Sequence, residues 1–329
     1  MIQGIKGIIA SHLLTPNTTT LQQILIALGL IIFVKHILKL SITLADLIFK
    51  RKRDLLKHYG ENSYVVITGS TGGIGNALAM EFAKLGFNII SISRNNQKLQ
   101  KTEKELLKAN PKIKVKSVQT DFSRASDLKI FDEIHSKIEH LDISLLVNNV
   151  GIDIPLQLHD MTPALLQRMV SINVLTTLLM TRTLLPKLRN RKKVSAVVNM
   201  SSIGGHLPMA YLAPYCASKA FVDMLTASLE KENRGLVEFV SVKPSEVSTA
   251  MTNHKETDVM TISAEQCARA ILGELRKGVR QTAGHWNHKL QEALYLGLPG
   301  WLYDLVWENF VIKQFYEERG ISGFKPLGR

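Results

Sequence analysis

The sequence predicts an α/β fold built on a doubly wound parallel sheet, with an N-terminal membrane anchor and a C-terminal extension. Short β-branched runs alternate with amphipathic stretches in the middle of the chain, a glycine-rich segment follows the first run, and an apolar segment lies near the N-terminus. We therefore expect three parts: the anchor with its basic flank at 1–58, the α/β domain at 59–285, and an aromatic extension at 286–329.

The composition limits which classes of protein this chain can belong to. Its 329 residues are 45% hydrophobic and 21% charged, with a mean hydropathy of +0.06, which excludes a mainly disordered, collagen-like or polytopic membrane chain. Two cysteines exclude a disulfide framework and a cysteine-based zinc site, and the ten histidines show no metal-ligand spacing, so we expect no metal. The formal net charge of +13 suits an anionic partner.

The N-terminal segment combines an apolar run with a basic cluster. Every residue from Ile24 to Val34 is apolar or glycine, and after Lys35 and His36 a mainly apolar stretch continues from Ile37 to Phe49. The first run is shorter than the roughly 20 residues that span hydrocarbon, so spanning and monotopic anchors both stay open, with a buried core helix as the alternative. The positive-inside rule and Arg51–Arg53 place the following domain in the cytosol. We expect a membrane, and no nucleic acid, as the anionic partner.

The middle of the chain alternates predicted strands and helices. The strands are short, β-branched or apolar runs, as expected for strands buried on both faces: Tyr64–Thr68, Asn88–Ile92, Ile113–Val118, Ile143–Val147, Ser195–Asn199 and Val237–Val242. The helices are the longer stretches between and after them: 73–85, 96–109, 126–139, 163–188, 213–232 and 264–277. This βαβ series predicts a parallel sheet whose ligands bind at the carboxyl ends of the strands.

A glycine-rich segment, Thr68–Gly75, follows the first strand and opens the next helix. Glycines let a backbone turn tightly and approach a pyrophosphate, while the helix N-terminus supplies free N–H groups. This placement predicts a Rossmann-like dinucleotide site, and an ordinary glycine-rich turn is the alternative. The candidate cofactor residues here are Gly69, Ser70, Gly73, Ile74 and Gly75.

The residues after the second and third strands bear on the choice of cofactor. Arg94 stands where an acidic residue would usually bind an adenosine ribose, and an arginine there suits a 2′-phosphate. NADP is therefore favoured over NAD, with a solvated loop arginine as the alternative. Asp121 follows the third strand, where it could contact adenine or cap the helix that begins near Ser123.

Tyr215 and Lys219 are four residues apart on a predicted helix and therefore share one face. A phenol with a pKa near 10 donates a proton poorly at neutral pH, and a neighbouring ammonium lowers that pKa. Ser202 comes thirteen residues before Tyr215, after a strand, where its hydroxyl could hold a carbonyl oxygen. A tyrosine and a lysine one helical turn apart are common on protein surfaces, so the pair alone would carry little weight.

In combination these motifs resemble those of the short-chain dehydrogenases/reductases over about residues 60 to 285. The segments that occur in the order and spacing of that family are Thr68–Gly75, Asn148–Gly151, Asn173, Ser202 and Tyr215-x-x-x-Lys219. Within the family the chain is most similar to membrane-bound very-long-chain 3-oxoacyl-CoA reductases and type 12 17β-hydroxysteroid dehydrogenases. That similarity lies in Leu146–Gly151, Tyr215–Asp223, the anchor and Leu298–Tyr303.

The resemblance implies a role for each matching residue. Tyr215 would be the general acid, Lys219 would hold the nicotinamide ribose, and Ser202 would orient the substrate carbonyl. Asn173 would position a water in a proton relay. The other residues expected to contact the cofactor are Asn149, Pro244, Val247 and Thr249.

The chain departs from the family pattern in three places. Ser245 replaces a usual glycine, which puts the local turn and the substrate entrance in question. Gly72 replaces an aspartate common in the nearest relatives. The C-terminal dilysine retrieval signal is missing, so retention in the endoplasmic reticulum would need another signal.

The resemblance implies NADPH-dependent reduction of a 3-oxoacyl-CoA to a 3-hydroxyacyl-CoA in fatty-acid elongation, at the endoplasmic reticulum membrane with the reductase domain facing the cytosol. The expected partners are an acyl-CoA or other lipid carbonyl substrate, the membrane, a second copy of the chain, and elongation-complex proteins. Reduction of a 17-ketosteroid or other lipid ketone is one alternative, and a noncatalytic NADP-binding scaffold is another. The intact set of Tyr215, Lys219, Ser202 and Asn173 argues against the scaffold.

All three tryptophans, Trp286, Trp301 and Trp307, lie in the C-terminal extension beside other aromatic residues. This clustering fits an amphipathic segment at a membrane interface, and packing against the core or a second subunit fits equally well.

Overall fold

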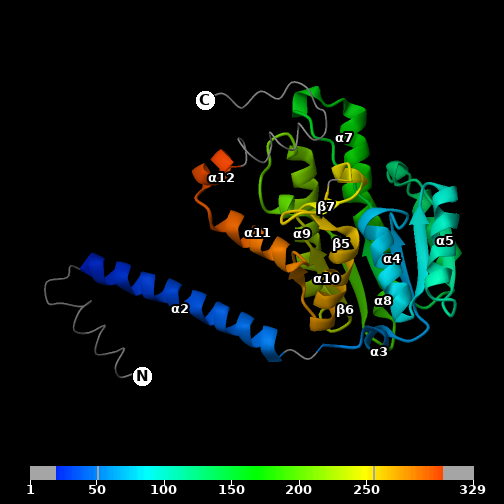
Figure 1. Cartoon of the computed structure of the whole chain (residues 1–329), viewed down its shortest axis with the longest axis horizontal. Helices are drawn as coiled ribbons and strands as arrows, with labels where there is room; N and C mark the ends of the chain where they lie inside the picture. The colour runs from blue at the N-terminus through cyan, green and yellow to red at the C-terminus, as the bar shows by residue number, and fades with distance from the viewer. Residues whose placement is uncertain (1–19, 50–51, 255, 307–329) are drawn as a thin grey trace. The chain divides into compact units, whose positions relative to one another are not determined.

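The computed structural model describes residues 20–49, 52–254 and 256–306, and it divides into two compact units, Met1–Lys52 and Arg53–Arg329 (Figure 1). Trp307 and Arg51, on which two of the sequence predictions partly rest, lie outside the described residues.

The first unit contains the helix α2 (Thr20–Phe49), which is 30 residues long. Most of its described apolar side chains are exposed, with Ile31 64% and Phe33 62% accessible. The apolar part of α2 that is described, Gln22–Lys35, is shorter than a membrane span. The described helix long and apolar enough to cross a membrane is Pro163–Arg189, which packs on the sheet of the second unit. The membrane anchor therefore stays a prediction.

The second unit is built on a seven-stranded parallel sheet in the order β3-β2-β1-β4-β5-β6-β9. This order confirms the doubly wound fold, because the chain starts in the middle, at β1, and adds strands outward in both directions. The strands are β1 (Tyr64–Thr68), β2 (Asn88–Ser93), β3 (Val115–Gln119), β4 (Ile143–Asn148), β5 (Ser195–Met200), β6 (Val237–Val242) and β9 (Gln281–Thr282).

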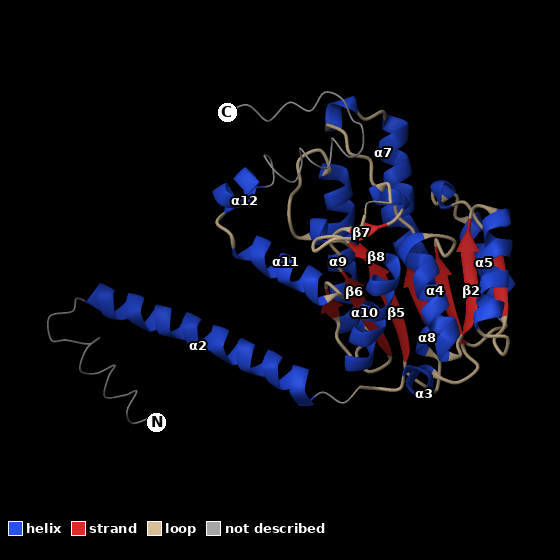
Figure 2. Ribbon diagram, in the orientation of Figure 1, coloured by secondary structure: helices blue, strands red, loops and turns tan. Residues whose placement is uncertain are grey.

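Helices cover both faces of this sheet (Figure 2). One face packs against α4 (Gly73–Leu85), α5 (Asn96–Ala109) and α10 (Ala264–Lys277). The other packs against α6 (Lys129–Ile138), α8 (Thr176–Arg189) and α9 (Ala213–Glu232). Every residue of β4, β5 and β6 is buried, which explains why these strands read as nearly continuous apolar runs.

Shorter elements lie at the carboxyl edge of the sheet and at the two ends of the unit. They are α3 (Leu55–Tyr59), η2 (Phe122–Arg124), η3 (Leu158–Asp160), α7 (Pro163–Val170), η4 (Ser171–Leu175), η5 (Ile203–Gly205), β7 (Val247–Ser248), η6 (Ala250–Thr252), β8 (Ile262–Ser263), α11 (Trp286–Gly297) and α12 (Gly300–Val306).

The element bounds differ from the sequence prediction in a few places. The stretch 163–188 is not one regular helix, because a π-helical turn, η4, separates α7 from α8. The helix expected at 126–139 begins only at Lys129, which donates its backbone N–H to the Asp127 carboxylate at 3.2 Å. The expected boundary at residue 59 also differs, since α3 already belongs to the second unit and buries Leu55 and Tyr59.

Glu238 on β6 ties the start of this unit to the sheet. Its carboxylate accepts hydrogen bonds from Arg53 (2.7 Å) and from the Tyr59 hydroxyl (2.8 Å), and it pairs with Arg280 (3.0 Å). Burial raises the pKa of Glu238, but the hydrogen bonds from Arg280, Arg53 and Tyr59 outweigh burial and lower that pKa to about 2. The ionised carboxylate therefore stabilises the fold.

We expect Glu238→Gln to lower the free energy of unfolding by about 2 to 3 kcal/mol at pH 7. Because the folded-state pKa lies below the ordinary value of 4.5, the stabilisation is complete above pH 4.5 and is lost as the pH falls toward 2. In urea unfolding in detergent, the difference in the free energy of unfolding between wild type and variant should thus decrease from pH 7 to pH 3. Glu139→Gln is the control, since that side chain is 58% exposed; a gap independent of pH would contradict the argument.

Candidate active site

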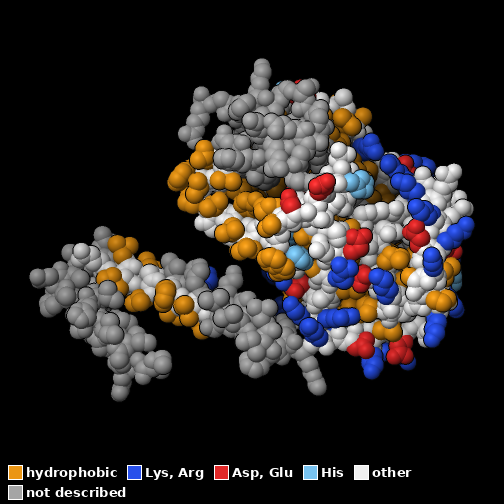
Figure 3. All heavy atoms as spheres, viewed as in Figure 1, with side chains coloured by type: hydrophobic (Ala, Val, Ile, Leu, Met, Phe, Trp, Pro, Cys, Tyr) orange, Lys and Arg blue, Asp and Glu red, His pale blue; other side chains and the backbone are white. Residues whose placement is uncertain are grey.

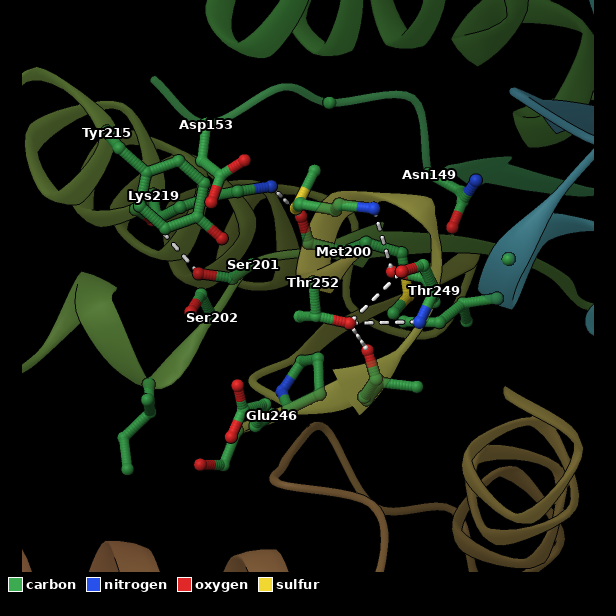
Figure 4. A pocket seen from close by; sticks show the side chains of 18 of the residues that line it. Asn149, Asp153, Met200, Ser201, Ser202, Tyr215, Lys219, Glu246, Thr249 and Thr252 are labelled. Atoms are coloured by element: carbon green, nitrogen blue, oxygen red, sulfur yellow. Dashed lines mark hydrogen bonds between the residues drawn. The ribbon is translucent and has the colours of Figure 1, made fainter. Parts of the chain in front are cut away.

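A cavity of about 500 Å³ opens at the carboxyl ends of the central strands. Its walls come from the glycine-rich loop after β1, the loop after β4, the segment after β5, α9, the loop after β6, and α11 (Figure 4). The predicted site residues that line it are Gly69, Gly73, Ile74, Asn149, Ser202, Tyr215, Lys219, Pro244, Val247 and Thr249.

The loop after β1 has the shape of a phosphate cradle. Gly69 and Gly73 take φ values of +66° and +53°, which favour glycine. A Cβ on Gly75 would collide with the Asn149 side-chain nitrogen and the Gly69 carbonyl oxygen, so no larger residue fits there. The Asn149 amide donates to the carbonyl oxygen of Thr68 at 3.0 Å and thereby fixes the turn.

Two further features of the cradle suit a dinucleotide. The hydroxyl of Ser70 is fully buried and has no hydrogen-bond partner among the described residues, which suits an absent polar ligand. The N-terminus of α4 begins at Gly73, where its free N–H groups and dipole favour an anion. The residues present therefore fit the pyrophosphate of a nicotinamide dinucleotide.

Arg94 and Asp121 lie outside the lining of this cavity. Arg94 is exposed just after β2, and its guanidinium pairs with no acidic side chain in the described part of the chain. Asp121 accepts the backbone N–H of Ser123 at 3.0 Å, so it caps η2, which is the second of the two roles considered for it. A role for either in binding the adenosine end of a cofactor stays a prediction.

The loop after β6 closes over the glycine-rich turn. A Cβ on Gly73 would lie 3.1 Å from the Thr249 methyl group, so the two segments are in close contact. Thr252 fixes the loop by donating its hydroxyl to the Val247 carbonyl at 2.8 Å and accepting the Thr249 N–H at 3.0 Å. Val247 in turn pairs with Ile262 in the small sheet β7-β8.

Tyr215 and Lys219 face the cavity from one side of α9, as their spacing predicts. The Lys219 ammonium lies 5.7 Å from the centroid of the Tyr215 ring and donates to the Met200 carbonyl at 2.8 Å. Burial lowers the pKa of Lys219 and the charges of Asp223 and Asp153 raise it, with a net value of about 8. At neutral pH the buried lysine is thus a cation beside the phenol.

Ser202 reaches the same cavity from the segment after β5, and its hydroxyl accepts the Gly204 N–H at 3.2 Å, which leaves its own proton available for a substrate oxygen.

Asn173, by contrast, is buried within η4 and does not line the cavity. Its side chain bonds both the N–H and the carbonyl of Ile152 at 2.9 Å and donates to Ser218 at 3.1 Å. It therefore fixes the loop after β4 against α9.

Asp153 is a cavity residue that the sequence reasoning did not single out. It projects from the loop after β4 toward Tyr215 and Lys219 (Figure 4), and its charge raises the pKa of the lysine. The sequence holds a usable signal, because this acidic residue comes two positions after the Asn148–Gly151 motif, which follows the central strand.

Helix α11 forms another wall of the cavity, whereas the sequence predicts that residues 286–329 form a separate extension. Gln291 and Tyr295 line the cavity from this helix. Ser245, where the family has a glycine, donates its hydroxyl to Gln291 at 2.7 Å. The serine at this position therefore links the loop after β6 to α11 by a hydrogen bond.

Comparison with known proteins gives consistent matches. The family model described as short chain dehydrogenase matches residues 63–259. The chain is 37% identical over 247 residues to 17-beta-hydroxysteroid dehydrogenase type 3 of Danio rerio, covering 73% of this chain and 78% of the relative. It is 33% identical over 249 residues to very-long-chain 3-oxoacyl-CoA reductase of Homo sapiens, covering 74% and 78%.

Among solved structures, the fold is similar to a short-chain dehydrogenase from Sphingobium yanoikuyae in complex with NADPH. The TM-score is 0.60 at 22% identity, over 72% of this chain and 97% of that one. At this identity the likeness concerns the fold.

The position of Asp153 predicts a change in pH dependence. Asp153→Asn removes a negative charge near the Lys219 ammonium, so the pKa of the lysine should fall below about 8. The alkaline limb of carbonyl reduction, followed as kcat/KM against pH, should then move to lower pH by about 1 unit. Asp160→Asn, at an exposed aspartate, is the control. An unmoved limb in Asp153→Asn would show that this carboxylate does not sustain the charge of Lys219.

Proposed function

We propose, on the premise that the chain belongs to the short-chain dehydrogenase family, that it reduces the ketone of a lipid with NADPH. The observation that carries this proposal is the convergence of Tyr215, Lys219 and Ser202 on one cavity, opposite the glycine cradle of a dinucleotide site. The chain is thus an oxidoreductase, and the noncatalytic scaffold has no support in this geometry.

The reduction needs a hydride and a proton. The bound nicotinamide would supply the hydride to the carbonyl carbon. Tyr215 would donate its hydroxyl proton to the carbonyl oxygen, and Ser202 would hold that oxygen by a hydrogen bond. The Lys219 ammonium, 5.7 Å from the phenol ring centroid, would stabilise the phenolate that forms. Asn173 would act through the backbone of Ile152, with the water relay implied by the family as a further proposal.

The proposed cofactor is NADPH rather than NADH. Arg94 follows β2 at the position that meets the adenosine ribose in this fold, and its sequence neighbours Ser93 and Asn95 carry no negative charge. The placement of Arg94 favours a 2′-phosphate there.

The proposed substrate is a 3-oxoacyl-CoA, as for the human relative. The cavity beyond the catalytic residues is lined largely by apolar side chains, including Met209, Leu212, Met251, Met260 and Tyr295. An acyl chain fits such a lining, and so does a steroid. The higher identity to the zebrafish 17-beta-hydroxysteroid dehydrogenase, 37% against 33%, keeps a 17-ketosteroid as the second candidate.

The proposed location is the endoplasmic reticulum membrane. The apolar side chains of α2 would anchor the chain, and the basic residues after it would hold the catalytic unit in the cytosol, where NADPH and acyl-CoA are available. A second copy of the chain and elongation-complex proteins are the proposed partners.

The assignment of Tyr215 is tested with NADPH and panels of 3-oxoacyl-CoA and ketosteroids. Tyr215→Phe removes only the proton donor, so kcat/KM should fall by about 10² to 10⁴ while NADPH affinity, measured by fluorescence titration, stays nearly unchanged. Lys219→Ala added to Tyr215→Phe should lower kcat/KM much less than Lys219→Ala alone lowers it in the wild type, because the two side chains act as a unit. Tyr64→Phe, at the amino end of β1, is the control. Substantial turnover by Tyr215→Phe would refute the role.

The choice of cofactor is tested by Arg94→Ala. A charge-assisted bond to a phosphate is worth about 1.5 to 3 kcal/mol, so the variant should bind NADPH about one to two decades more weakly. NADH affinity should hardly change, because NADH carries no 2′-phosphate. Lys98→Ala, on the first turn of α5, is a control for general loss of positive charge. Equal losses for both cofactors would exclude Arg94 as the phosphate ligand.

A further inference from the structure

Helix α11 buries its polar side and exposes its apolar side, which is the opposite of a helix on the surface of a water-soluble protein. Its polar residues Asn287, His288 and Gln291 are 6%, 0% and 5% exposed. Its apolar residues point outward, with Trp286 67% and Leu294 58% exposed. A soluble helix normally buries its apolar stripe and exposes its polar one. The outer face of α11 therefore suits an apolar environment.

The inward polar face fixes the helix to the cavity loops. Gln291 donates to the Met260 carbonyl at 3.0 Å and accepts from Ser245 at 2.7 Å. Asn287 donates to the carbonyl of Val259, and a His288 ring nitrogen lies 3.1 Å from the carbonyl oxygen of Glu246. These bonds set the rotation of α11, so the exposure of its apolar face is built into the fold.

The exposed face continues from α11 onto α12 and the loop before β8. We define the apolar face by its exposed members: Trp286, Leu290, Leu294, Leu296, Trp301, Leu305, Val259 and Met260. Hydrophobic side chains gather over α11 and α12 in Figure 3. Such a contiguous patch marks a site of contact with a partner or a membrane.

The apolar face borders the cavity that would take the substrate. Met260 is 43% exposed and also lines the cavity. Tyr295 lines the cavity from the same helix that presents Leu294 outward. A hydrocarbon substrate could thus pass between the apolar face and the cavity without crossing water.

We propose that the apolar face docks on the surface of a lipid bilayer and that the lipid ketone enters the cavity from the membrane. This inference rests on the proposed function, in that the substrate is a lipid. It goes beyond the N-terminal anchor, because it gives the catalytic unit its own membrane contact and an orientation.

The chemistry of the apolar face favours lipid over a protein partner. The charged side chains of α11 do not take part in it, since Lys289 pairs with Glu274 at 2.8 Å and Glu292 with Lys243 at 3.3 Å. Protein interfaces are usually specified by about one hydrogen bond per 100–200 Å². The outward residues of α11 offer only the indole N–H of Trp286, and tryptophan is typical of membrane interfaces.

The contact can be tested directly, because the chain has only three tryptophans. Two single-tryptophan variants of the full chain, Trp301→Phe with Trp307→Phe and Trp286→Phe with Trp307→Phe, leave Trp286 or Trp301 as the only tryptophan, whose emission is excited selectively at wavelengths that tyrosine does not absorb. Each would be reconstituted into phosphatidylcholine vesicles with or without bromine on the acyl chains. We expect brominated lipid to quench both tryptophans.

Undiminished emission in brominated lipid would overturn the proposal, whatever the activity of the protein. Shielding of both tryptophans from brominated lipid and from aqueous acrylamide would also overturn it, because a second copy or another segment of the chain would then cover the face. The quenching needs no turnover, so failure of the proposed function, seen as absence of NADPH oxidation with every ketone, is a separate result.

Substrate entry is tested by placing charge on the apolar face. Leu290→Glu with Leu294→Glu should raise the KM for a long-chain ketone presented in vesicles by at least about tenfold. The reason is that burying a glutamate in lipid, in place of each leucine, is unfavourable. The kcat of the same double variant for a short, water-soluble ketone should equal that of the wild type. Leu128→Glu, at a leucine 62% exposed before α6, is the matched control. An unchanged KM for the vesicle-borne ketone would overturn entry from the membrane.

Discussion

The proposed catalytic centre depends on the interaction between the buried Lys219 ammonium and the Tyr215 ring. Burial lowers the pKa of this lysine, and the fold opposes that shift with a hydrogen bond to the Met200 carbonyl and with the negative charges of Asp223 and Asp153. Asp223 lies one helical turn after Lys219 on α9, whereas Met200 ends β5 and Asp153 belongs to the loop after β4. The proposed catalytic pair is local in sequence, but two of the three groups that sustain the charge of Lys219 are brought to it by the tertiary structure.

Asp223, whose charge raises the pKa of the lysine, is itself held in place. Asp223 accepts a hydrogen bond from Ser241 on β6 and pairs with His206 at 3.2 Å. Glu292 of α11 lies 3.8 Å from His206. These polar contacts connect α9, which carries Tyr215 and Lys219, to α11, which forms a wall of the cavity. The placement of α11 and the electrostatics of the active site are therefore parts of one network.

Stability and catalysis use opposite ends of the same sheet strands. Glu238, near the amino end of β6, holds α3 and Arg280 through ionic hydrogen bonds, while Pro244 and the loop after the carboxyl end of β6 close over the cavity. Parallel strands make this separation natural, because their carboxyl ends open where loops and helix N-termini can meet a ligand. Ser245 then adapts the family architecture by joining that loop to α11.

The sequence by itself determined the elements whose signals are local. The bounds predicted for β1, α4, α5, α9, β6 and α10 agree with the structure, because strand and helix periodicity, glycines and caps act over a few residues. The shared face of Tyr215 and Lys219 follows from helical spacing in the same way. Only the tertiary structure decided that Asp153 faces Lys219, that Glu238 clamps α3, and that α11 turns its polar side inward. Those features depend on contacts between residues far apart in the chain, which no local pattern records.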